Sequence, residues 1–506
     1  MIRLTHNGVA ASRLLVLGLL LAAIAVPLMM AAKPAHASTT FTVNSTADHS
    51  DAVLGVDGCF TGFTVDGAGG AKVPECTLRA ALNEANYTSG ADTINFAIAG
   101  TGVKTIAPES ELPTITEAVT INGYSQPGTQ PNQKAVGSDA LLKIELSGAS
   151  VPGSYGLQIG AANSTVKGLI INRWHGGVRM SGNDAKGNKV VGNYIGTDPS
   201  GTKDLGNLTG GVTIVDAPNN VVGGTTAATR NVIVFNGNGV DIQGVEVEGN
   251  YIGTDPSGTK DLGASGDGVR ISAADNTVGG TTAGARNIIS ANDEGVVIVG
   301  SSAKGNRIVG NYIGTDASGT KDLGNDTSGV TIVDAPNNTI GATIAGARNI
   351  IAFNGEAGVC VIGQSATGNR VLSNSIFSTL GLGIDLGGDG PTANDAGDAD
   401  TGPNGLQNKP RVTSAKTGAL KTTINARLNS APNRTFVVQF FSNPSGTDEG
   451  RVFIGQRSVT TDGSGNVSFA FSPAQKVGLG RTITATATSP AGDTSEFSAA
   501  RTVVSA

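Results

Sequence analysis

The sequence predicts an all-β protein: a right-handed parallel β-helix with an N-terminal helical cap and a C-terminal immunoglobulin-like β-sandwich. The first observation is a repeated pattern, Gly-Val-x-Ile or a close variant, which begins at Gly156, Gly177, Gly211, Gly239, Gly268, Gly295, Gly329, Gly358 and Gly383. A repeat of roughly 20–35 residues is typical of a solenoid, in which each repeat is one turn of a stacked array. The second is composition, since 74 of 506 residues are Gly, as many tight turns require.

The third observation is the alternation within the pattern. Val and Ile flank the x position, as in Val212-Thr213-Ile214. Successive side chains of a strand point to opposite faces, so we expect Val and Ile to face a core and x to face outward. The predicted outward row is Gln158, Arg179, Thr213, Asp241, Arg270, Val297, Thr331, Cys360 and Asp385.

Residues 1–37 have the features of a secretory signal peptide. Arg3 and Arg13 precede an apolar run over residues 14–30, and Ala35-His36-Ala37 resembles a cleavage site. A membrane anchor is the alternative, but the run is short for a span. We expect cleavage near Ala37, a secreted or cell-surface protein, and no transmembrane span in the mature chain.

Net charge argues against one class of partner. The signal segment contains three basic residues and no acidic one, so its removal changes the net charge from −6 to −9. Nucleic-acid binding needs clustered Lys and Arg, so we expect no nucleic acid and no unaided binding of polyanionic sugars.

Residues 38–91 are predicted to form an entry module. Residues 40–43 are predicted to form a strand, and residues 76–86 favour a helix because Leu78, Ala81, Leu82 and Ala85 make one apolar stripe. Such a helix suits the cap that the open end of a solenoid needs. Cys59 and Cys76 lie in a loop-rich region of an exported chain, so we predict a disulfide between them.

The stretch Cys76-Thr77-Leu78-Arg79-Ala80-Ala81, with Asn83-Glu84-Ala85-Asn86 after it, resembles the CSLREA-type domain of secreted bacterial proteins. Thr77 replaces the Ser of that signature and Ala80 replaces its Glu. The repeated Gly-Asn-Tyr-Ile-Gly-Thr-Asp and the segments 120–128 and 383–408 also resemble proteins of this type. The resemblance implies an extracellular β-helix protein and brings no defined catalytic site.

Residues 92–407 are predicted to be the β-helix and residues 408–506 the β-sandwich. From about residue 156 the coils alternate in pairs, with Asn193, Asn250 and Asn311 at one equivalent place and Asn231, Asn287 and Asn349 at another. Stacked Asn side chains can satisfy turn amides of neighbouring coils. In the C-terminal part, short apolar runs separated by turns such as residues 462–465 favour a sandwich.

Two groups of residues are candidate binding sites. Tyr194, Tyr251 and Tyr312 recur every second coil, roughly 10 Å apart, and could stack on alternate units of a glycan or form an interior aromatic stack. Asp389, Asp395, Asp398 and Asp400 cluster in a Gly-rich segment, where carboxylate oxygens suit calcium or form a solvated acidic loop. Asp198, Asp255 and Asp316 begin Asp-x-Ser-Gly turns, which is ordinary turn chemistry.

No catalytic residue is predicted. Asp241 and Asp385 in the outward row are five coils apart, about 24 Å at the usual strand spacing, too far for a glycosidase pair. Asp241 and Arg270, on neighbouring coils, are predicted to form an ion pair. We therefore expect a non-catalytic secreted or cell-surface protein that binds a polysaccharide or cell-envelope glycan, or mediates adhesion. The alternatives are a calcium-dependent polysaccharide lyase or glycoside hydrolase of the β-helix type, and a structural envelope component.

Overall fold

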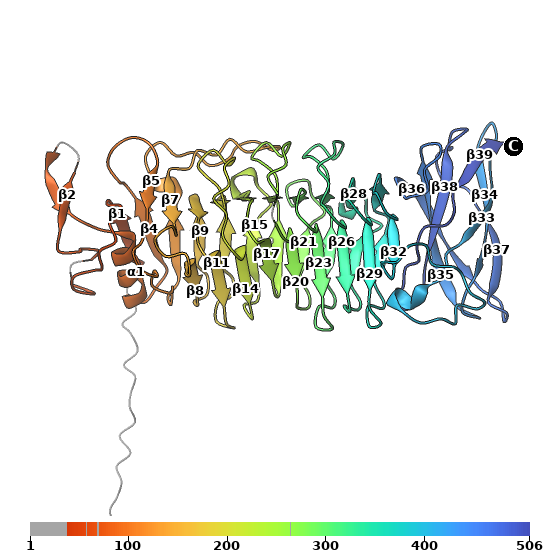
Figure 1. The fold of residues 1–506 in the computed structure, drawn as a ribbon, viewed down its shortest axis with the longest axis horizontal. Coiled ribbons are helices and arrows are strands. Elements are labelled where there is room, and N and C mark those ends of the chain that lie inside the picture. The colour runs from red at the N-terminus through yellow and green to blue at the C-terminus, as the bar shows by residue number, and fades with distance from the viewer. Residues whose placement is uncertain (1–37, 57, 68–69, 264) are drawn as a thin grey trace, which may run out of the picture. The chain divides into compact units, whose positions relative to one another are not determined.

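The computed structural model describes residues 38–56, 58–67, 70–263 and 265–506. The predicted signal peptide lies outside these residues. Three long parallel sheets, of 11, 10 and 9 strands, make up most of the described chain. Successive strands of each sheet come from successive coils, so the predicted parallel β-helix is confirmed (Figure 1). Among the described residues, no helix is long and apolar enough to cross a membrane.

The strands of the β-helix are short. The 11-stranded sheet contains β1 (Thr40–Val43), β4 (Asp92–Phe96), β6 (Val119–Asn122), β9 (Thr165–Lys167), β12 (Lys189–Val191), β15 (Asn220–Gly223), β18 (Val245–Glu248), β21 (Thr277–Gly279), β24 (Arg307–Val309), β27 (Thr339–Gly341) and β30 (Arg370–Leu372). The 10-stranded sheet contains β5 (Lys104–Ile106), β7 (Ile144–Ser147), β10 (Leu169–Asn172), β13 (Tyr194–Ile195), β16 (Val232–Ile233), β19 (Tyr251–Ile252), β22 (Ile288–Ile289), β25 (Tyr312–Ile313), β28 (Ile350–Ala352) and β31 (Ser375–Phe377). The nine-stranded sheet contains β8 (Tyr155–Ile159), β11 (Gly176–Ser181), β14 (Gly210–Val215), β17 (Asn238–Ile242), β20 (Val269–Ile271), β23 (Val296–Val299), β26 (Val330–Val333), β29 (Val359–Ile362) and β32 (Ile384–Leu386).

The repeated Gly-Val-x-Ile pattern forms the nine-stranded sheet. Val212 pairs with Val240, and both are fully buried in one apolar core that continues from the cap to Leu386. The glycine of the pattern lies where the chain turns into the strand. A Cβ on Gly239 would lie 2.6 Å from Cγ2 of Ile252 and 2.5 Å from the carbonyl oxygen of Gly268. The glycine therefore recurs because no side chain fits between the core and the next coil.

Buried Asn side chains connect neighbouring coils through hydrogen bonds. The backbone N–H of Asn193 donates to Oδ1 of Asn231 at 2.9 Å, and the N–H of Asn250 donates to Oδ1 of Asn287 at 2.9 Å. The two predicted Asn series therefore belong to one ladder, whose members are Asn193, Asn231, Asn250, Asn287, Asn311, Asn349 and Asn374. Two further ladders run from Asn276 to Asn404 and from Asn292 to Asn354. Each satisfies turn amides that the sheets leave unpaired.

The N-terminal end of the core is covered by α1 (Leu78–Tyr87). The side chain of Thr77 accepts the N–H of Ala80 and so caps the helix. Leu78, Leu82 and the rest of the apolar stripe join the β-helix core, as the sequence predicts. β1 pairs with β4, so the 11-stranded sheet already begins inside the entry module. A small antiparallel ribbon, β2 (Thr64–Asp66) and β3 (Lys72–Pro74), is also part of this module.

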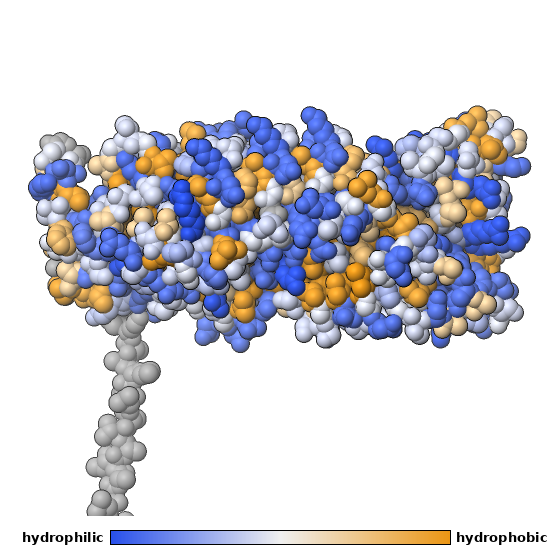
Figure 2. Space-filling model, viewed as in Figure 1, coloured by the Kyte–Doolittle hydropathy of each residue, from blue (hydrophilic) through white to orange (hydrophobic). Residues whose placement is uncertain are grey.

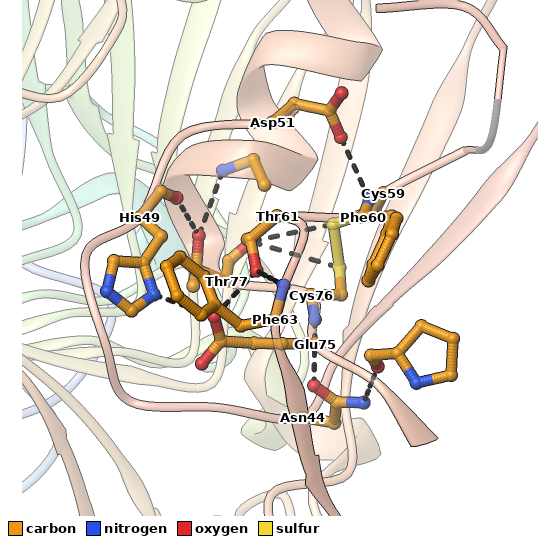
Figure 3. The surroundings of a disulfide bond; sticks show 12 residues. Asn44, His49, Asp51, Cys59, Phe60, Thr61, Phe63, Glu75, Cys76 and Thr77 are labelled. Atoms are coloured by element: carbon orange, nitrogen blue, oxygen red, sulfur yellow. Dashed lines mark hydrogen bonds and ion pairs between the residues drawn. A yellow bond between two sulfur atoms is a disulfide. The ribbon is translucent and has the colours of Figure 1, made fainter. Parts of the chain in front are cut away.

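A disulfide and a buried carboxylate hold the entry module together (Figure 3). Cys59 and Cys76 are joined, with Cα atoms 5.2 Å apart. The carboxylate of Glu75 accepts hydrogen bonds from Ser45 at 2.7 Å and Thr61 at 2.6 Å, and pairs with His49 Nδ1 at 2.7 Å. Burial alone would raise the pKa of Glu75, but these hydrogen bonds outweigh it and the pKa is lowered.

The C-terminal part is a β-sandwich of seven strands, as predicted. They are β33 (Arg411–Thr417), β34 (Thr422–Asn429), β35 (Thr435–Asn443), β36 (Val452–Thr460), β37 (Asn466–Phe471), β38 (Thr482–Thr488) and β39 (Arg501–Ser505). They enclose a separate core around Phe436 and Phe440. The last coils contact this unit directly, since Ser373 bonds to Gln439 and Phe497 packs against the β-helix core.

Candidate functional site

The outer face of the nine-stranded sheet presents the predicted outward row. Arg179, Thr213, Asp241, Arg270 and Val297 pair in register on consecutive coils, and Thr331, Cys360 and Asp385 continue the row. The row therefore runs along the axis of the β-helix, with one side chain per coil. Thr213 and Asp241 are half-buried, and Val297, Thr331 and Cys360 are buried, with 4–6% of their surface exposed. The expectation that the x side chains are exposed is therefore wrong for these three residues.

A second row of side chains on this face is acidic and was missed by the sequence analysis. Asp267 and Glu294 stand one residue before the repeated glycine on adjacent coils, and Asp293 and Glu356 stand two residues before it. Glu294 accepts a hydrogen bond from Thr331 of the outward row at 3.0 Å. The alternating strand pattern reveals only the x positions, which follow each glycine, whereas the acidic residues precede it. Counting the residues that precede each glycine would have found this row.

These carboxylates influence one another. Burial raises the pKa of Glu294, the hydrogen bond from Thr331 opposes this, and Asp267, Asp293 and Glu356 raise it further. Burial likewise raises the pKa of Asp267, with Arg270 acting in the opposite direction and Asp293 adding to the rise. The face therefore holds several acidic groups that are partly desolvated and only partly neutralised, which makes them good acceptors or proton donors for a bound ligand.

The predicted ion pair between Asp241 and Arg270 is wrong, because Arg270 pairs with Asp267 instead. Arg270 Nη1 lies 2.9 Å from Oδ2 of Asp267, three residues earlier on the same coil. Arg270 still lowers the pKa of Asp241, but burial dominates and the net direction is upward. A carboxylate on the same coil competes successfully because its position one residue before the glycine directs it over the strand.

An apolar row runs beside the acidic one. Val299, Val333 and Ile362 occupy the last position of β23, β26 and β29, and Ile362 is 36% exposed. Figure 2 shows a hydrophobic patch over these strands. Cys360 lies between the rows and is buried; its burial, together with Asp385, Glu294 and Glu356, raises its pKa to about 12. Cys360 is therefore a protonated thiol at neutral pH and not a nucleophile.

The three tyrosines do not form an open platform. They lie on the outer face of the 10-stranded sheet, but Tyr194 and Tyr251 are each only 3% exposed, because the segment 123–141 covers them. Tyr251 Oη accepts the N–H of Gly137 at 2.8 Å, and Tyr194 bonds to Ser138 at 3.1 Å. The glycan-stacking prediction is therefore wrong for these two rings. Tyr312, which lies beyond this segment, is half-buried.

Three of the four predicted calcium ligands come together. Asp395, Asp398 and Asp400 have carboxylate oxygens within 4.8 Å of one another. Asp389 is exposed and lies outside this group, so its inclusion is corrected. Oδ1 of Asp400 is buried and has no hydrogen-bond partner among the described residues. Burial and the carboxylate of Asp395 raise the pKa of Asp400, so an oxygen-preferring cation such as calcium fits this cluster.

Asp198, Asp255 and Asp316 act as turn residues, as predicted. In each turn the carboxylate accepts the hydroxyl of the Ser two residues on, for example Ser257 to Asp255 at 2.7 Å, and a backbone N–H, for example Thr259 to Asp255 at 3.0 Å. Burial opposes these hydrogen bonds, but the pKa of Asp255 is lowered. These carboxylates are thus fully engaged by their own turns.

Comparisons with known proteins identify no family and one similar fold. No protein-family model matches the sequence, and no curated protein matches it. Among solved structures, the fold is similar to the tailspike protein gp49 of the Acinetobacter baumannii bacteriophage Fri1, a capsular polysaccharide depolymerase. The similarity covers 81% of this chain and 77% of the tailspike, with 10% sequence identity and a TM-score of 0.27. Neither value indicates a shared activity.

Proposed function

We propose that this protein binds glycan chains outside the cell along the outer face of its nine-stranded sheet, without cleaving them. The observation that carries the proposal is the pair of parallel rows on this face. Carboxylates of Asp267 and Glu294 supply acceptors for sugar hydroxyls, and Val299, Val333 and Ile362 supply an apolar surface for sugar rings. The two carboxylates stand on the adjacent coils of β20 and β23, and the three apolar side chains stand on those of β23, β26 and β29. A coil spacing of about 4.8 Å along this face suits an extended chain molecule.

The charge of the face narrows the ligand class. The row has two basic members, Arg179 and Arg270, and only Arg270 is on a coil next to Asp241. Acidic groups therefore outnumber basic ones around Asp241, Asp267 and Glu294. A polyanionic sugar would be repelled, whereas neutral or amino-sugar-containing chains would not. Among the described residues, the aromatic ring of this row is that of Tyr155, which lies four coils from Asp267 and has Arg179 over it. No ring is therefore at hand beside Asp267 and Glu294, so we expect weak binding per sugar unit and a dependence on chain length.

Export is part of this proposal. The apolar segment at residues 14–30 and the disulfide between Cys59 and Cys76 support an oxidising compartment. The residues that resemble the CSLREA signature have structural roles in the cap: Cys76 forms the disulfide, Thr77 caps α1, and Arg79 pairs with Asp48 at 2.9 Å. We therefore propose membership of that group of secreted proteins.

A polysaccharide array tests the binding proposal. We expect retention on neutral or amino-sugar polysaccharides, and a loss for the double variant Asp267→Asn with Glu294→Gln. Asp448→Asn, which removes one exposed carboxylate from the sandwich, is the control for a loss of acidic charge away from the face and should bind normally. Equal binding by the double variant, or preferential binding to uronic-acid polymers that requires Asp267 and Glu294, would contradict the proposal.

Hydrolysis is the second candidate function, because Asp267 and Glu294 stand on adjacent coils with raised pKa values. Coil spacing places such a pair near the short end of the roughly 5–9.5 Å range of glycosidase carboxyls. One protonated and one ionised member would provide an acid and a base or nucleophile. A reducing-end assay, run beside an assay for unsaturated product, separates hydrolase from lyase activity. Activity that disappears in Glu294→Gln would replace the non-catalytic proposal.

A further inference from the structure

A stack of arginines over aromatic rings runs along the outer face of the 10-stranded sheet. Arg230 lies over the ring of Tyr251, with Cζ 4.6 Å from the centroid, and Arg286 lies over Tyr312 at 4.1 Å. The two arginines are held in the same way. Nε of Arg230 donates to the carbonyl oxygen of Gly249 at 3.3 Å, and Nε of Arg286 donates to that of Gly310 at 3.2 Å. They are thus equivalent positions of successive two-coil units.

The two arginines differ in what their terminal nitrogens bind. Nη1 and Nη2 of Arg230 donate to the carbonyl oxygens of Lys134 and Ala135 at 3.1 and 2.9 Å, and Nη1 also donates to Gly137. These carbonyls belong to the covering segment 123–141. For Arg286, no acceptor for either Nη is found in the described part of the chain. The hydroxyl of Tyr312 likewise lacks the kind of partner that Gly137 gives Tyr251.

A pocket of about 280 Å³ lies between the covered and the open unit. Arg286, Tyr251 and Ile288 line it on the sheet side, and Gln133, Val136 and Thr225 line it from the loops. No carboxylate is among its lining residues, and within the described residues neither Arg230 nor Arg286 takes part in a salt bridge. Two guanidinium groups therefore stand unneutralised in a protein whose net charge is −6.

We propose that this pocket binds a single carboxylated sugar of the hexuronic acid class. The carbonyl oxygens bound by Arg230 show which kind of acceptor the equivalent nitrogens of Arg286 can donate to, and a carboxylate supplies two such oxygens in the geometry of a guanidinium fork. Gln133 and Thr225 offer polar groups to sugar hydroxyls, while Val136 and Ile288 offer an apolar wall to the ring. The volume admits one monosaccharide. This site lies on a different sheet from the proposed glycan face and is independent of it.

Calorimetric titration with galacturonate tests the proposal, with galactose as the uncharged match. We expect galacturonate to bind at least about tenfold more tightly than galactose, since a charge-assisted pair to Arg286 is lost in the neutral sugar. Arg286→Gln should weaken galacturonate binding by about tenfold or more and leave galactose binding unchanged. Arg307→Gln, which removes an exposed arginine of β24, is the matched control and should have no effect.

Three results would overturn the proposal. These are equal affinities for galacturonate and galactose, unchanged galacturonate binding by Arg286→Gln, and no binding of galacturonate to the full chain. Circular dichroism of Arg286→Gln ensures that a loss of binding is not a loss of fold. Because Asp267 and Glu294 are not in this pocket, the double variant Asp267→Asn with Glu294→Gln should still bind galacturonate, so failure here leaves the glycan-face proposal unaffected.

Discussion

Two outer faces of the same β-helix differ in whether a loop covers them. On the 10-stranded sheet, the outward side chains from Ile170 to Ile288 are apolar or aromatic, and the segment 123–141 buries Tyr194 and Tyr251. On the nine-stranded sheet, the outward side chains are mostly polar or acidic, and Asp241 and Glu294 remain partly accessible. Coil geometry is the same for both sheets. The difference teaches that a segment between two coils, rather than the coils themselves, decides which outer face of the solenoid stays accessible.

The largest expected effect is the difference in unfolding free energy between a variant of the core and a variant of the open face. Ile242 is fully buried and its neighbour Asp241 faces outward. Ile242→Asp places an unpaired charge in the core, so we expect a loss of about 3–5 kcal/mol in the free energy of unfolding. Asp241→Asn should change it by less than about 1 kcal/mol. Equal melting temperatures for Ile242→Asp and the wild type would show that the strand register is incorrect.

The next effect tests the covered face. Tyr251→Ala removes a buried ring beneath the loop, so we expect a loss of about 3 kcal/mol in urea unfolding. Tyr312→Ala should lose clearly less, because Tyr312 is half-buried and lies beyond the covering segment 123–141. Tyr251→Phe, which removes only the acceptor for Gly137, should lose about 1 kcal/mol. If both alanine variants are equally destabilised, the loop does not distinguish the two coils.

A third effect concerns carboxylates at the end of the β-helix, where a cation rather than a loop would cover them. If Asp395, Asp398 and Asp400 hold calcium, a concentration of about 100 times the dissociation constant adds about 2.7 kcal/mol to stability. Calcium should therefore raise the melting temperature, and a chelator should reverse the rise. Asp400→Asn should abolish the shift, whereas Asp389→Asn should retain it. A calcium response that survives Asp400→Asn would place the ion elsewhere.

The smallest expected effect is a difference in the pH dependence of stability between acidic groups of the open face and those of the turns. The raised pKa of Glu294 means that its protonated form stabilises the fold below the unfolded pKa of about 4.5, and that this contribution is lost as pH rises through the folded pKa. Glu294→Gln should therefore melt slightly higher than the wild type at pH 7, by less than about 1 kcal/mol because solvent screens the group, and the gain should vanish near pH 4.

Asp255 should behave in the opposite way. Its pKa is lowered, so its contribution is present above the unfolded value of 3.8 and is lost as pH falls through the folded pKa. Asp255→Asn should be destabilised at pH 7 by about 1 kcal/mol, and the difference should shrink in acid. Melting curves of both variants between pH 3 and 7 check the two signs. The same sign for Glu294 and Asp255 would mean that face and turn carboxylates do not differ.

The sequence was sufficient for the architecture because each coil repeats the same local signal. Val212 and Ile214, two residues apart, identify the inward face without reference to any other coil. The acidic row was missed because Asp267 and Glu294 lie outside the alternating strand, at a point where the chain bends around the glycine. The burial of Tyr251 depends on Gly137, which is 114 residues away, and no local pattern predicts that contact.

The Asn ladders allow two-coil units of the β-helix to be added or removed. Each coil offers the next the same donor and acceptor, so a duplicated or deleted two-coil unit meets the partner it would have met before. One ladder ends at Asn404, whose side-chain amide donates to the carbonyl oxygen of Thr494 in the sandwich. This last Asn of the ladder therefore bonds to a residue of another domain instead of to the next coil. The length of the β-helix can therefore change by unequal crossing-over between repeats, while both closing modules stay as they are.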